Sequence, residues 1–475
     1  MIDQFLSQPA SGEAVAGIEG LIRTALFGTG TAIVGYLLQV LADRIDASYQ
    51  PRPGETFKER TSVSVQCLFG TFPLKRDYYY HPALGGHYPA DDAMGVEVGC
   101  TPALARLACL EGADESGFDK AQKHLLETGG IDMDSRQIHR LIQRVGPVSL
   151  AWQQREYKIG QEDRTPVPIM YVSADGTGIP MRKKELEGRA GKQADGTSKT
   201  RQVYLGCVFT QHQIDEKGRP VRDWNSTTYV SSMESNDVFG PILRAEALRR
   251  GMAYAEKVIL LIDGARGLEN LGLCNFKDAL QIVDFYHAME HAGKVLVVLL
   301  GNKDHPDYKR RRGHWARRLL KNGVQNLIAE ARQECAGDSR SEALEKELTY
   351  FVNNIQRMQY GTFRKQGYFI GSGVIEAGCK TVVGGRCKQS GMFWGKPGAE
   401  HILSLRCINA SWRDAEFWNH RINLISSRYP SRKRAAKITM KNFVMRPNFV
   451  NFEVNKENLF LPRFANCLIV RTRSG

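Results

Sequence analysis

The chain has 475 residues, a length that predicts two to four domains at roughly 100–200 residues each. Hydrophobic residues make up 42 %, so a buried core can form. The 65 Lys and Arg outnumber the 51 Asp and Glu and give a formal net charge of +14, which favours DNA or RNA as a partner over an ordinary basic soluble protein. The ten cysteines contain no CxxC pair, which disfavours a zinc ribbon, and they are typical of reduced thiols in a cytoplasm.

We expect a helical N-terminal segment over residues 1–60, without a signal peptide. Residues 25–42 approach the composition of a membrane span. Three glycines, two threonines and a glutamine weaken that interpretation, and the run barely reaches the ~20 residues that a span needs. A buried or amphipathic helix and no membrane association are therefore predicted.

Residues 61–160 are predicted to be mainly helical, with an irregular aromatic patch and a helix-turn-helix-like unit. Helical stretches near 101–112 and 116–128 precede a Gly-Gly turn, after which Asp134-Ser135 can cap a further helix. Three arginines recur every four residues along one face of that helix: Arg136, Arg140 and Arg144. This face can meet DNA as a recognition helix does, or it can be the solvated basic face of an ordinary helical hairpin.

Residues 161–302 have the pattern of a mixed α/β sheet, with strands first and then strands alternating with helices. Apolar runs that predict strands lie at 167–174, 202–210, 227–231, 257–263 and 279–284. A helical pattern covers 238–254, and 181–201 has the composition of a basic loop.

Residues 303–370 are strongly charged and lack strand signals, so they predict an all-helical insertion in the α/β domain. The domain resumes over 371–427, where a Gly-flanked helix begins. Residues 428–475 form a basic, irregular tail in which 457–470 can be one late strand.

Two aspartates and one glutamate have the properties that metal-dependent phosphoryl transfer requires. Asp175 and Asp263 each follow a buried strand and precede a glycine, and the end of a strand holds a ligand rigidly. For either one alone, a simple Asp-Gly turn is an equal alternative. Glu376 lies in the first turns of a helix that Ser372 can cap, among small and apolar residues that suggest a buried carboxylate. The alternative for Glu376 is an ordinary helical pair with Lys380.

Several long segments of the chain resemble the signature blocks of ISKra-type insertion-sequence transposases. They are VSADGTGIP (172–180), LLIDGARGLENL (260–271), LQIVDFYHAMEH (280–291), GSGVIEAGCKTVVGGRCKQSGMFW (371–394) and GAEHILSLR (398–406), in the order that this family shows. The resemblance covers about 65–430. It implies a DDE transposase with a ribonuclease-H-like catalytic domain, a helical insertion before the glutamate, and Asp175, Asp263 and Glu376 as catalytic and metal-binding residues.

The same resemblance places Asp284 and His287 beside the active site, because related transposases carry Asp or Cys, two residues, then His after the second aspartate. A helix cap and a surface histidine are the alternatives, and Asp284 is also the second choice for the second catalytic acid. The family often has paired cysteines in the region that matches 78–90. This chain has His81 and His87 there and no cysteine, so zinc is not predicted.

Phosphoryl transfer of this kind needs charge neutralisation and in-line positioning, which two Mg²⁺ ions supply and Mn²⁺ can replace. Further candidate DNA contacts are Arg310, Arg311, Arg312, Arg386, Lys388 and Trp394, although Trp394 is equally a core residue. The expected partners are double-stranded DNA, as the element's terminal inverted repeats and as target, and a second copy of the chain. The alternative functions are a catalytically silent DNA-binding protein and a structure-specific nuclease of the same fold.

Overall fold

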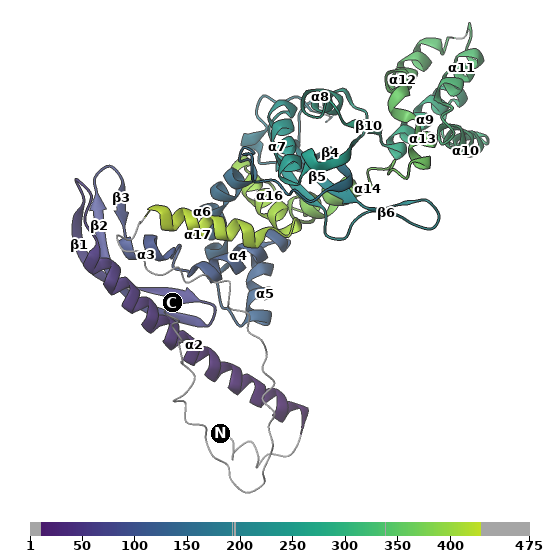
Figure 1. Ribbon diagram of the computed structural model, residues 1–475. Helices are drawn as coiled ribbons and strands as arrows, with labels where there is room; N and C mark the ends of the chain where they lie inside the picture. The colour runs from purple at the N-terminus through teal and green to yellow at the C-terminus, as the bar shows by residue number, and fades with distance from the viewer. Residues whose placement is uncertain (1–10, 192, 194–195, 338, 429–475) are drawn as a thin grey trace. The chain divides into compact units, whose positions relative to one another are not determined.

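The computed structural model describes residues 11–191, 193, 196–337 and 339–428 (Figure 1). Its first elements are a long helix and an antiparallel sheet of strand order β1-β2-β3. Their bounds are α2 Gly12–Ser48, β1 Thr56–Cys67, β2 Gly70–His81 and β3 Gly85–His87, followed by the short helix α3 Pro89–Met94. The strands lie where mainly helical structure was predicted. Their residues alternate in burial along β2 and are rich in Thr, Val and Tyr, a local signal for a half-buried sheet.

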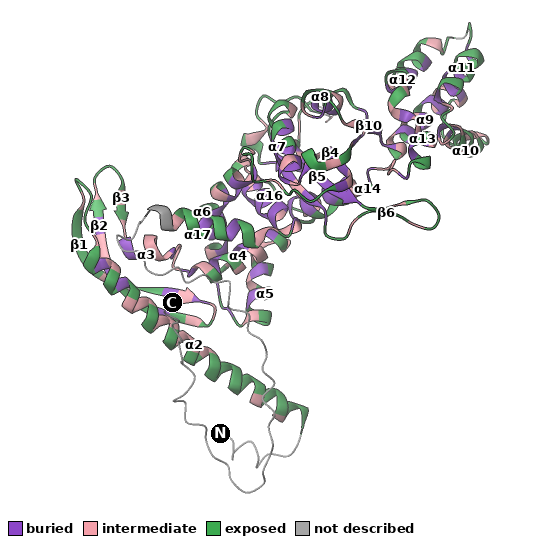
Figure 2. Cartoon of the chain, in the orientation of Figure 1, coloured by how far each residue is buried: buried purple, intermediate pink, exposed green. Residues whose placement is uncertain are grey.

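Helix α2 differs from the expected buried or amphipathic helix. Only Ala42 and Asp46 are buried, whereas Leu26 is 65 % and Tyr36 71 % exposed. Most of α2 is accordingly green in Figure 2. By length and composition α2 could cross a membrane, but one such helix near the N-terminus is weak evidence of a membrane protein. One flank of α2 packs on the core of the β1-β2 pair through residues such as Leu38.

The predicted helix-turn-helix region folds as three helices: α4 Pro102–Asp114, α5 Phe118–Gly129 and α6 Ser135–Gln153. Helix α5 is capped by the next residue, Gly130, whose φ of +65° is in the left-handed region. The Asp134 carboxylate accepts the N–H of Arg136 at 2.8 Å, which is the predicted cap of α6. Helices α5 and α6, the turn between them and the capping residue Asp134 therefore agree with the sequence analysis.

A five-stranded mixed sheet forms the centre of the α/β domain, with strand order β10-β9-β4-β5-β8. Its strands are β4 Val167–Pro180, β5 Thr200–Gln211, β8 Thr228–Ser232, β9 Ala255–Ile262 and β10 Leu280–Val283. Strands β4, β5 and β8 pair antiparallel, whereas β9 and β10 run parallel to β4. The prediction of a mixed α/β sheet is confirmed.

Strand β4 is longer than predicted, because Asp175-Gly176 does not end it. The β4-β5 pairing continues from Asp175 opposite Leu205 to Pro180 opposite Thr200. Between β4 and β5 lies the short 3₁₀ helix η1 Lys183–Glu185, and a small ribbon of β6 Gln213–Ile214 and β7 Pro220–Val221 follows β5.

Both faces of the sheet are covered by helices. Helices α7 Asn236–Arg249 and α8 Arg266–Asn275 cover the face that carries Met170, Val172 and Ala174 of β4. A 3₁₀ turn, η2 Met252–Tyr254, joins α7 to β9. On the other face, Tyr171 and Ile179 of β4 belong to the largest core, which also includes residues of α4–α6 and of the C-terminal helices. These C-terminal elements are α14 Gly373–Gly378, the π-helical turn η4 Cys379–Gly384, α15 Gly385–Cys387, α16 Lys396–Ala410 and α17 Asp414–Arg428.

The described residues between β10 and α14 are entirely helical or loop, as predicted for the insertion. The helices are α9 Phe285–Leu300, α10 Tyr308–Leu319, α11 Val324–Glu334, α12 Ser341–Asn354, η3 Ile355–Met358 and α13 Tyr360–Lys365. Trp315, Leu327, Leu344 and Phe351 form part of their shared core. The strand predicted at 457–470 and the rest of the basic tail after residue 428 lie outside the described residues.

Candidate active site

Three aspartates lie at one level on three neighbouring strands. Strand β4 pairs with β9 so that Ser173 is opposite Leu261, and two residues further Asp175 reaches the level of Asp263. Strand β10 pairs with β9 so that Val283 is opposite Ile262, and the next residue on each strand is an acid, Asp284 and Asp263. Because side chains alternate along a strand, Asp175 shares the face of Tyr171, under the C-terminal helices.

Helix α14 brings Glu376 to this same face. Gly378 allows the close approach, because a Cβ atom there would lie 2.6 Å from the Tyr229 ring and 3.0 Å from Leu205. One residue further, burial and the neighbouring Asp175 carboxylate raise the pKa of the Cys379 thiol. The helix that carries Glu376 therefore lies directly beside Asp175.

A chain of hydrogen bonds connects Asp284 to Glu376. The completely buried Asp284 carboxylate caps α9 by accepting the N–H of His287 at 2.6 Å on Oδ1. Its other oxygen, Oδ2, accepts the N–H of Ser372. The Ser372 hydroxyl does not cap α14 as predicted but donates to Oε1 of Glu376 at 2.9 Å. Glu376 is thus held through Ser372 by Asp284, which is 92 residues earlier in the chain.

The three side chains of Asp284, His287 and Glu376 place ligand atoms within 4.8 Å of one another, close enough for one metal ion. Both Asp284 oxygens, however, already accept N–H groups. Asp263 is more available, because only its Oδ1 accepts a backbone N–H, from Ala265 at 2.8 Å, and its side chain is partly exposed. This difference favours Asp263 over Asp284 as a metal ligand and gives Asp284 a positioning role.

Burial and neighbouring charges shift the pKa values of three groups in the site, Asp263, Asp284 and His287. Burial, together with the like charges of Asp175 and Asp284, raises the pKa of Asp263 above its ordinary value. Burial alone would raise the pKa of Asp284 too, but the hydrogen bonds from His287 and Ser372 lower it. The hydrogen bond to Asp284 raises the pKa of His287 to about 9. An ionised Asp284 beside a protonated His287 is therefore the stable pair at neutral pH.

The helical insertion contributes directly to the position of Asp263. The Tyr350 hydroxyl, from α12, donates to the carbonyl oxygen of Asp263 at 2.7 Å. Gly264 has a φ of +80°, and a Cβ atom there would lie 3.0 Å from the Tyr350 hydroxyl. Sequence reasoning did not identify Tyr350, since no local pattern connects it with a strand end 87 residues earlier.

The predicted basic residues of α6 are at the surface. Arg136, Arg140 and Arg144 are all exposed, and Arg144 lies 3.7 Å from Glu97. Their common exposed face fits a contact with DNA phosphates.

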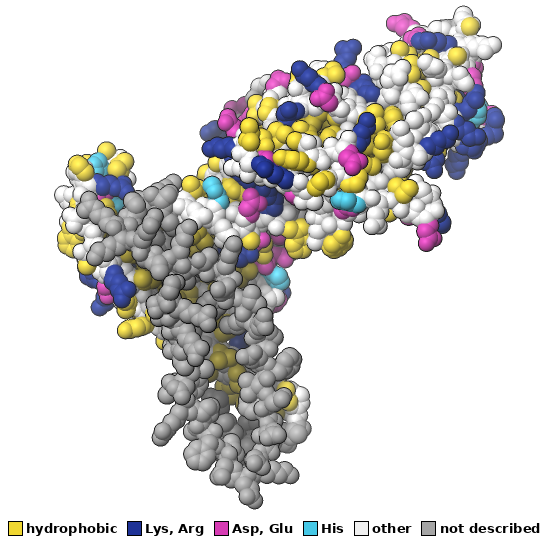
Figure 3. Space-filling model, viewed as in Figure 1, with side chains coloured by type: hydrophobic (Ala, Val, Ile, Leu, Met, Phe, Trp, Pro, Cys, Tyr) yellow, Lys and Arg dark blue, Asp and Glu magenta, His cyan; other side chains and the backbone are white. Residues whose placement is uncertain are grey.

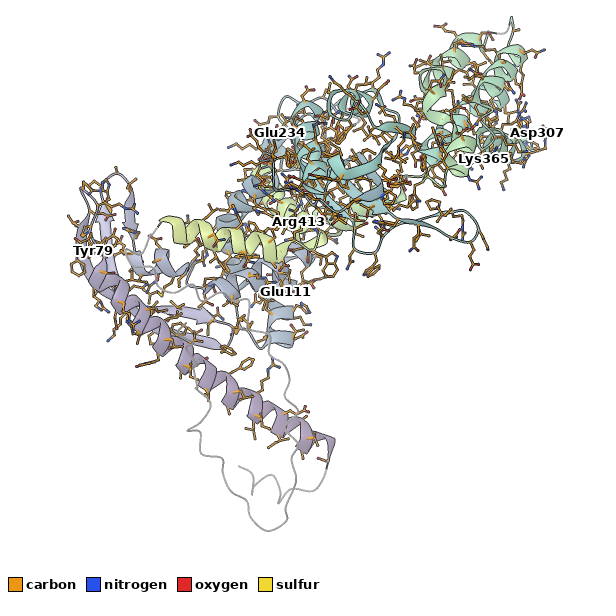
Figure 4. All side chains as sticks on the ribbon, in the orientation of Figure 1. Tyr79, Glu111, Glu234, Asp307, Lys365 and Arg413 are labelled. Atoms are coloured by element: carbon orange, nitrogen blue, oxygen red, sulfur yellow. The ribbon has the colours of Figure 1, made fainter. Side chains whose placement is uncertain are left out.

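Lys and Arg side chains also gather over α10, where they form a dark blue patch in Figure 3. Arg310 pairs with Asp307, which is labelled in Figure 4, and Arg311 pairs with Glu334. Arg312 lines a groove of about 950 Å³ between α9 and α10, which Tyr286 also lines. Two lysines in this groove, Lys294 and Lys303, were missed in the sequence because they are isolated from any basic run.

The three basic and aromatic candidates after Glu376 have different positions. Arg386 is only 1 % exposed and Trp394 9 %, so neither presents its side chain on the open surface, and Trp394 donates its indole N–H to the Cys387 carbonyl. Lys388 is exposed and donates to the Thr177 hydroxyl, two residues after Asp175. Lys388 is therefore the candidate phosphate contact nearest to the acids.

Comparison with known proteins gives one family match. No curated protein matches the sequence significantly. Among solved structures, the Drosophila P element transposase strand transfer complex is similar over 67 % of this chain and 80 % of that chain, with 11 % identity and a TM-score of 0.24, and no conclusion rests on a similarity this low. Residues 32–410 match a family described as an uncharacterised protein family, UPF0236. The chain therefore belongs to the UPF0236 family.

Proposed function

We propose that this protein is a DNA transposase of an insertion sequence, of the ISKra type, which cleaves and transfers DNA strands at the ends of its element. The observation that carries the proposal is the gathering of acids far apart in the chain. Asp175 and Asp263 share one level of the sheet, and Glu376 lies on the helix that covers the same face. Acidic groups on rigid elements are what metal-dependent phosphoryl transfer requires.

The sheet supports a ribonuclease-H-like catalytic domain. Three antiparallel strands, β4, β5 and β8, come first in this sheet, and β9 and β10 then extend it on the other side of β4. This order and these directions are typical of ribonuclease-H-like sheets. The helical insertion between Asp263 and Glu376 agrees with the resemblance to transposases.

The donor set fits magnesium, with manganese as a substitute. Carboxylate oxygens are the ligands that Mg²⁺ prefers, and the Asp263 carboxylate is partly exposed with one oxygen that accepts no backbone N–H. Asp175, Asp263 and Glu376 would hold two ions. When bound, such ions neutralise the charge of the phosphodiester and activate the attacking oxygen.

The other residues of the site position groups and bind phosphate. Ser372 orients the Glu376 carboxylate, and Asp284 fixes Ser372 through its backbone N–H. Lys388, beside Thr177, would bind a DNA phosphate next to the catalytic strand β4. Preorganised charges of this kind contribute most to catalysis by stabilising the transition state.

DNA would be bound by the exposed basic faces of α6 and α10 and by the groove that begins at Tyr286. The net charge of +14 favours such a partner. Double-stranded DNA, as terminal inverted repeats and as target, is the proposed substrate. A dimer that acts on DNA in the cytoplasm, associated with the nucleoid, completes the proposal.

Cleavage of the element's own ends tests the proposal. We expect Mg²⁺-dependent nicking and strand transfer, and a loss greater than the ~10²–10³-fold typical of one electrostatic stabiliser when Asp175, Asp263 or Glu376 is replaced by Ala. Asp237→Ala is the matched control, because Asp237 is exposed at the start of α7, on the opposite face of the sheet.

Three outcomes would contradict the proposal in different ways. Near-normal cleavage by one of the Ala variants would remove that residue from the catalytic set. Tight DNA binding without cleavage under Mg²⁺ or Mn²⁺ would favour a silent DNA-binding protein. Cleavage of branched DNA without joining would favour a structure-specific nuclease.

A further inference from the structure

A cavity of about 770 Å³ lies outside the acidic cluster, and its lining includes Arg136 of the basic face of α6. It is bounded by the N-terminal turns of α5 and α6, by the segment after β4 and by the chain between α15 and α16. Its volume is within the roughly 300–1,000 Å³ of ordinary small-ligand sites. Its size therefore admits a group as large as a nucleotide.

One wall of this cavity holds a buried guanidinium with unused hydrogen-bonding capacity. The Arg386 side chain lies 4.9 Å from the Phe118 ring centroid and 5.2 Å from that of Trp394. Its Nη1 donates to the Ser116 carbonyl at 3.3 Å and to the Met392 sulfur at 3.1 Å, whereas the buried Nε has no hydrogen-bond partner. Within the described chain no carboxylate pairs with this guanidinium. Because no carboxylate neutralises it, the Arg386 charge adds to the positive field of the cavity and favours an anionic ligand there.

The rim of the cavity combines aromatic and basic side chains. Phe393 is 61 % exposed and free to stack on a flat ring, and Arg136 and Arg182 are exposed beside it. Two acids, Asp119 and Glu185, also line the cavity.

Of the two acids, Glu185 is already engaged. It lies 3.7 Å from Arg201 and accepts the backbone N–H of Lys396 at 3.1 Å. The three arginines of the cavity therefore dominate its charge.

The cavity connects with the acidic cluster along one strand. Arg182 follows Asp175 by seven residues, about 23 Å at the ~3.3 Å per residue of a β-strand. Its backbone N–H donates to the Trp394 carbonyl at 2.9 Å, which attaches this end of β4 to the cavity wall. Lys388, two residues after Arg386, contacts Thr177 on the same strand. A DNA strand bound at the acids would reach the cavity within a few nucleotides.

We propose that this cavity binds an unpaired nucleotide of the DNA substrate, with its base against Phe393 and its phosphate near Arg136 and Arg182. Base stacking on an exposed aromatic side chain is tolerant of sequence, and guanidinium groups suit phosphate. The inference rests on the proposed function, because it takes DNA as the substrate. It adds that the enzyme selects DNA with unpaired nucleotides near the cleavage site.

The test measures binding of the full-length protein in EDTA to two duplexes of one sequence, one blunt and one with a short single-stranded tail that contains 2-aminopurine. We expect tighter binding of the tailed duplex and quenching of the 2-aminopurine fluorescence. Phe393→Ala and Arg182→Ala should each weaken tailed binding roughly 5- to 100-fold and leave blunt binding nearly unchanged. Trp224→Ala, which removes an aromatic side chain that is 86 % exposed elsewhere, is the control and should change neither.

Equal affinities for the tailed and blunt duplexes, or unchanged tail binding by both variants, would overturn the inference. Displacement of the tail by an equal concentration of free dAMP would also overturn it, in favour of a free-nucleotide site. Failure of the proposed function is a separate result, because binding in EDTA needs no cleavage. If the wild type does not cleave DNA but the Asp175→Ala variant still binds the tail, the proposed transposase activity is wrong. The inference that the cavity binds an unpaired nucleotide would then still hold.

Discussion

Replacing Asp263 by Asn should stabilise the metal-free protein, whereas the same replacement at Asp284 should destabilise it. Burial and its acidic neighbours raise the pKa of Asp263, so the folded state binds its proton more tightly than the unfolded state. The stability that this group contributes is complete below its unfolded pKa and is lost as the pH rises through its folded pKa. At pH 7 its charge therefore opposes folding, and removing that charge should gain about 1 kcal/mol.

The charge of Asp284 has the opposite effect on the free energy of unfolding, because it stabilises the folded state. Its lowered pKa means that its charge contributes stability above the unfolded pKa, and this stability is lost as the pH falls through the folded value. An Asn side chain has one carbonyl oxygen in place of the two carboxylate oxygens. The backbone N–H of either Ser372 or His287 would therefore lose its acceptor. One buried unsatisfied donor and the loss of charge assistance together cost roughly 2–4 kcal/mol.

The assay is thermal unfolding in EDTA and then in Mg²⁺. At ~2.1 cal/mol/K per residue, a chain of this length changes its Tm by roughly 1 °C per kcal/mol. We therefore expect about +1 °C for Asp263→Asn and about −2 to −4 °C for Asp284→Asn, with no change for the control Asp237→Asn. Saturating Mg²⁺ at ~100 times its Kd should raise the Tm of the wild type by roughly 3 °C and that of Asp263→Asn by much less. Equal destabilisation by both variants, or an undiminished Mg²⁺ shift in Asp263→Asn, would refute this reasoning.

Three further predictions concern the groups that support the acids. Tyr350→Phe should cost about 1 kcal/mol of stability, because the hydrogen bond to the Asp263 carbonyl is lost. It should also reduce the increase in Tm that Mg²⁺ causes. An equal Mg²⁺-induced increase in the variant and the wild type would contradict this prediction. Ser372→Ala should lower the cleavage rate but leave DNA affinity unchanged, as kinetics and gel shift would show, because only Glu376 loses its partner. Burial lowers the pKa of His291 to about 4, so its contribution to stability is lost as the pH falls from 6.5 towards 4. His291→Phe keeps the stacking on Tyr350. Its free energy of unfolding should therefore fall by roughly 1–2 kcal/mol less than that of the wild type when the pH is lowered from 7 to 5, as denaturant unfolding at the two pH values would show.

Local patterns in the sequence predicted the elements of the five-stranded sheet but not their pairing. The runs at 257–263 and 279–284 correspond to β9 and β10, because continuous apolar segments are typical of buried parallel strands. The extension of β4 beyond Asp175 depends on β5, since each further residue to Pro180 has a partner there. A two-residue Asp-Gly signal contains no information about that partner, so the strand was predicted to end too early.

The N-terminal part was predicted less well, for a different reason. Helix α2 is apolar on all sides, and such a helix normally indicates burial, yet one flank alone packs on the β1-β2 pair. The strands themselves were missed although Val63 and Val65 alternate with serines in β1. The aromatic run in β2 concealed the alternation, because Tyr78, Tyr79 and Tyr80 follow one another without a polar residue.

The helical insertion does more than separate Asp284 from Glu376 in the chain. Its two ends are joined at the acidic cluster, because Phe285 donates its N–H to the Ile370 carbonyl at 2.8 Å and Ser372 donates to Asp284. Closing a loop of this length costs entropy that grows only slowly with length, so a few strong bonds at its base suffice to hold it closed. The ionised Asp284 carboxylate accepts one of these bonds, at the point where the chain returns from the insertion. It fixes Ser372, at the start of α14, next to the strand ends and so helps to hold the helix that carries Glu376 against the sheet.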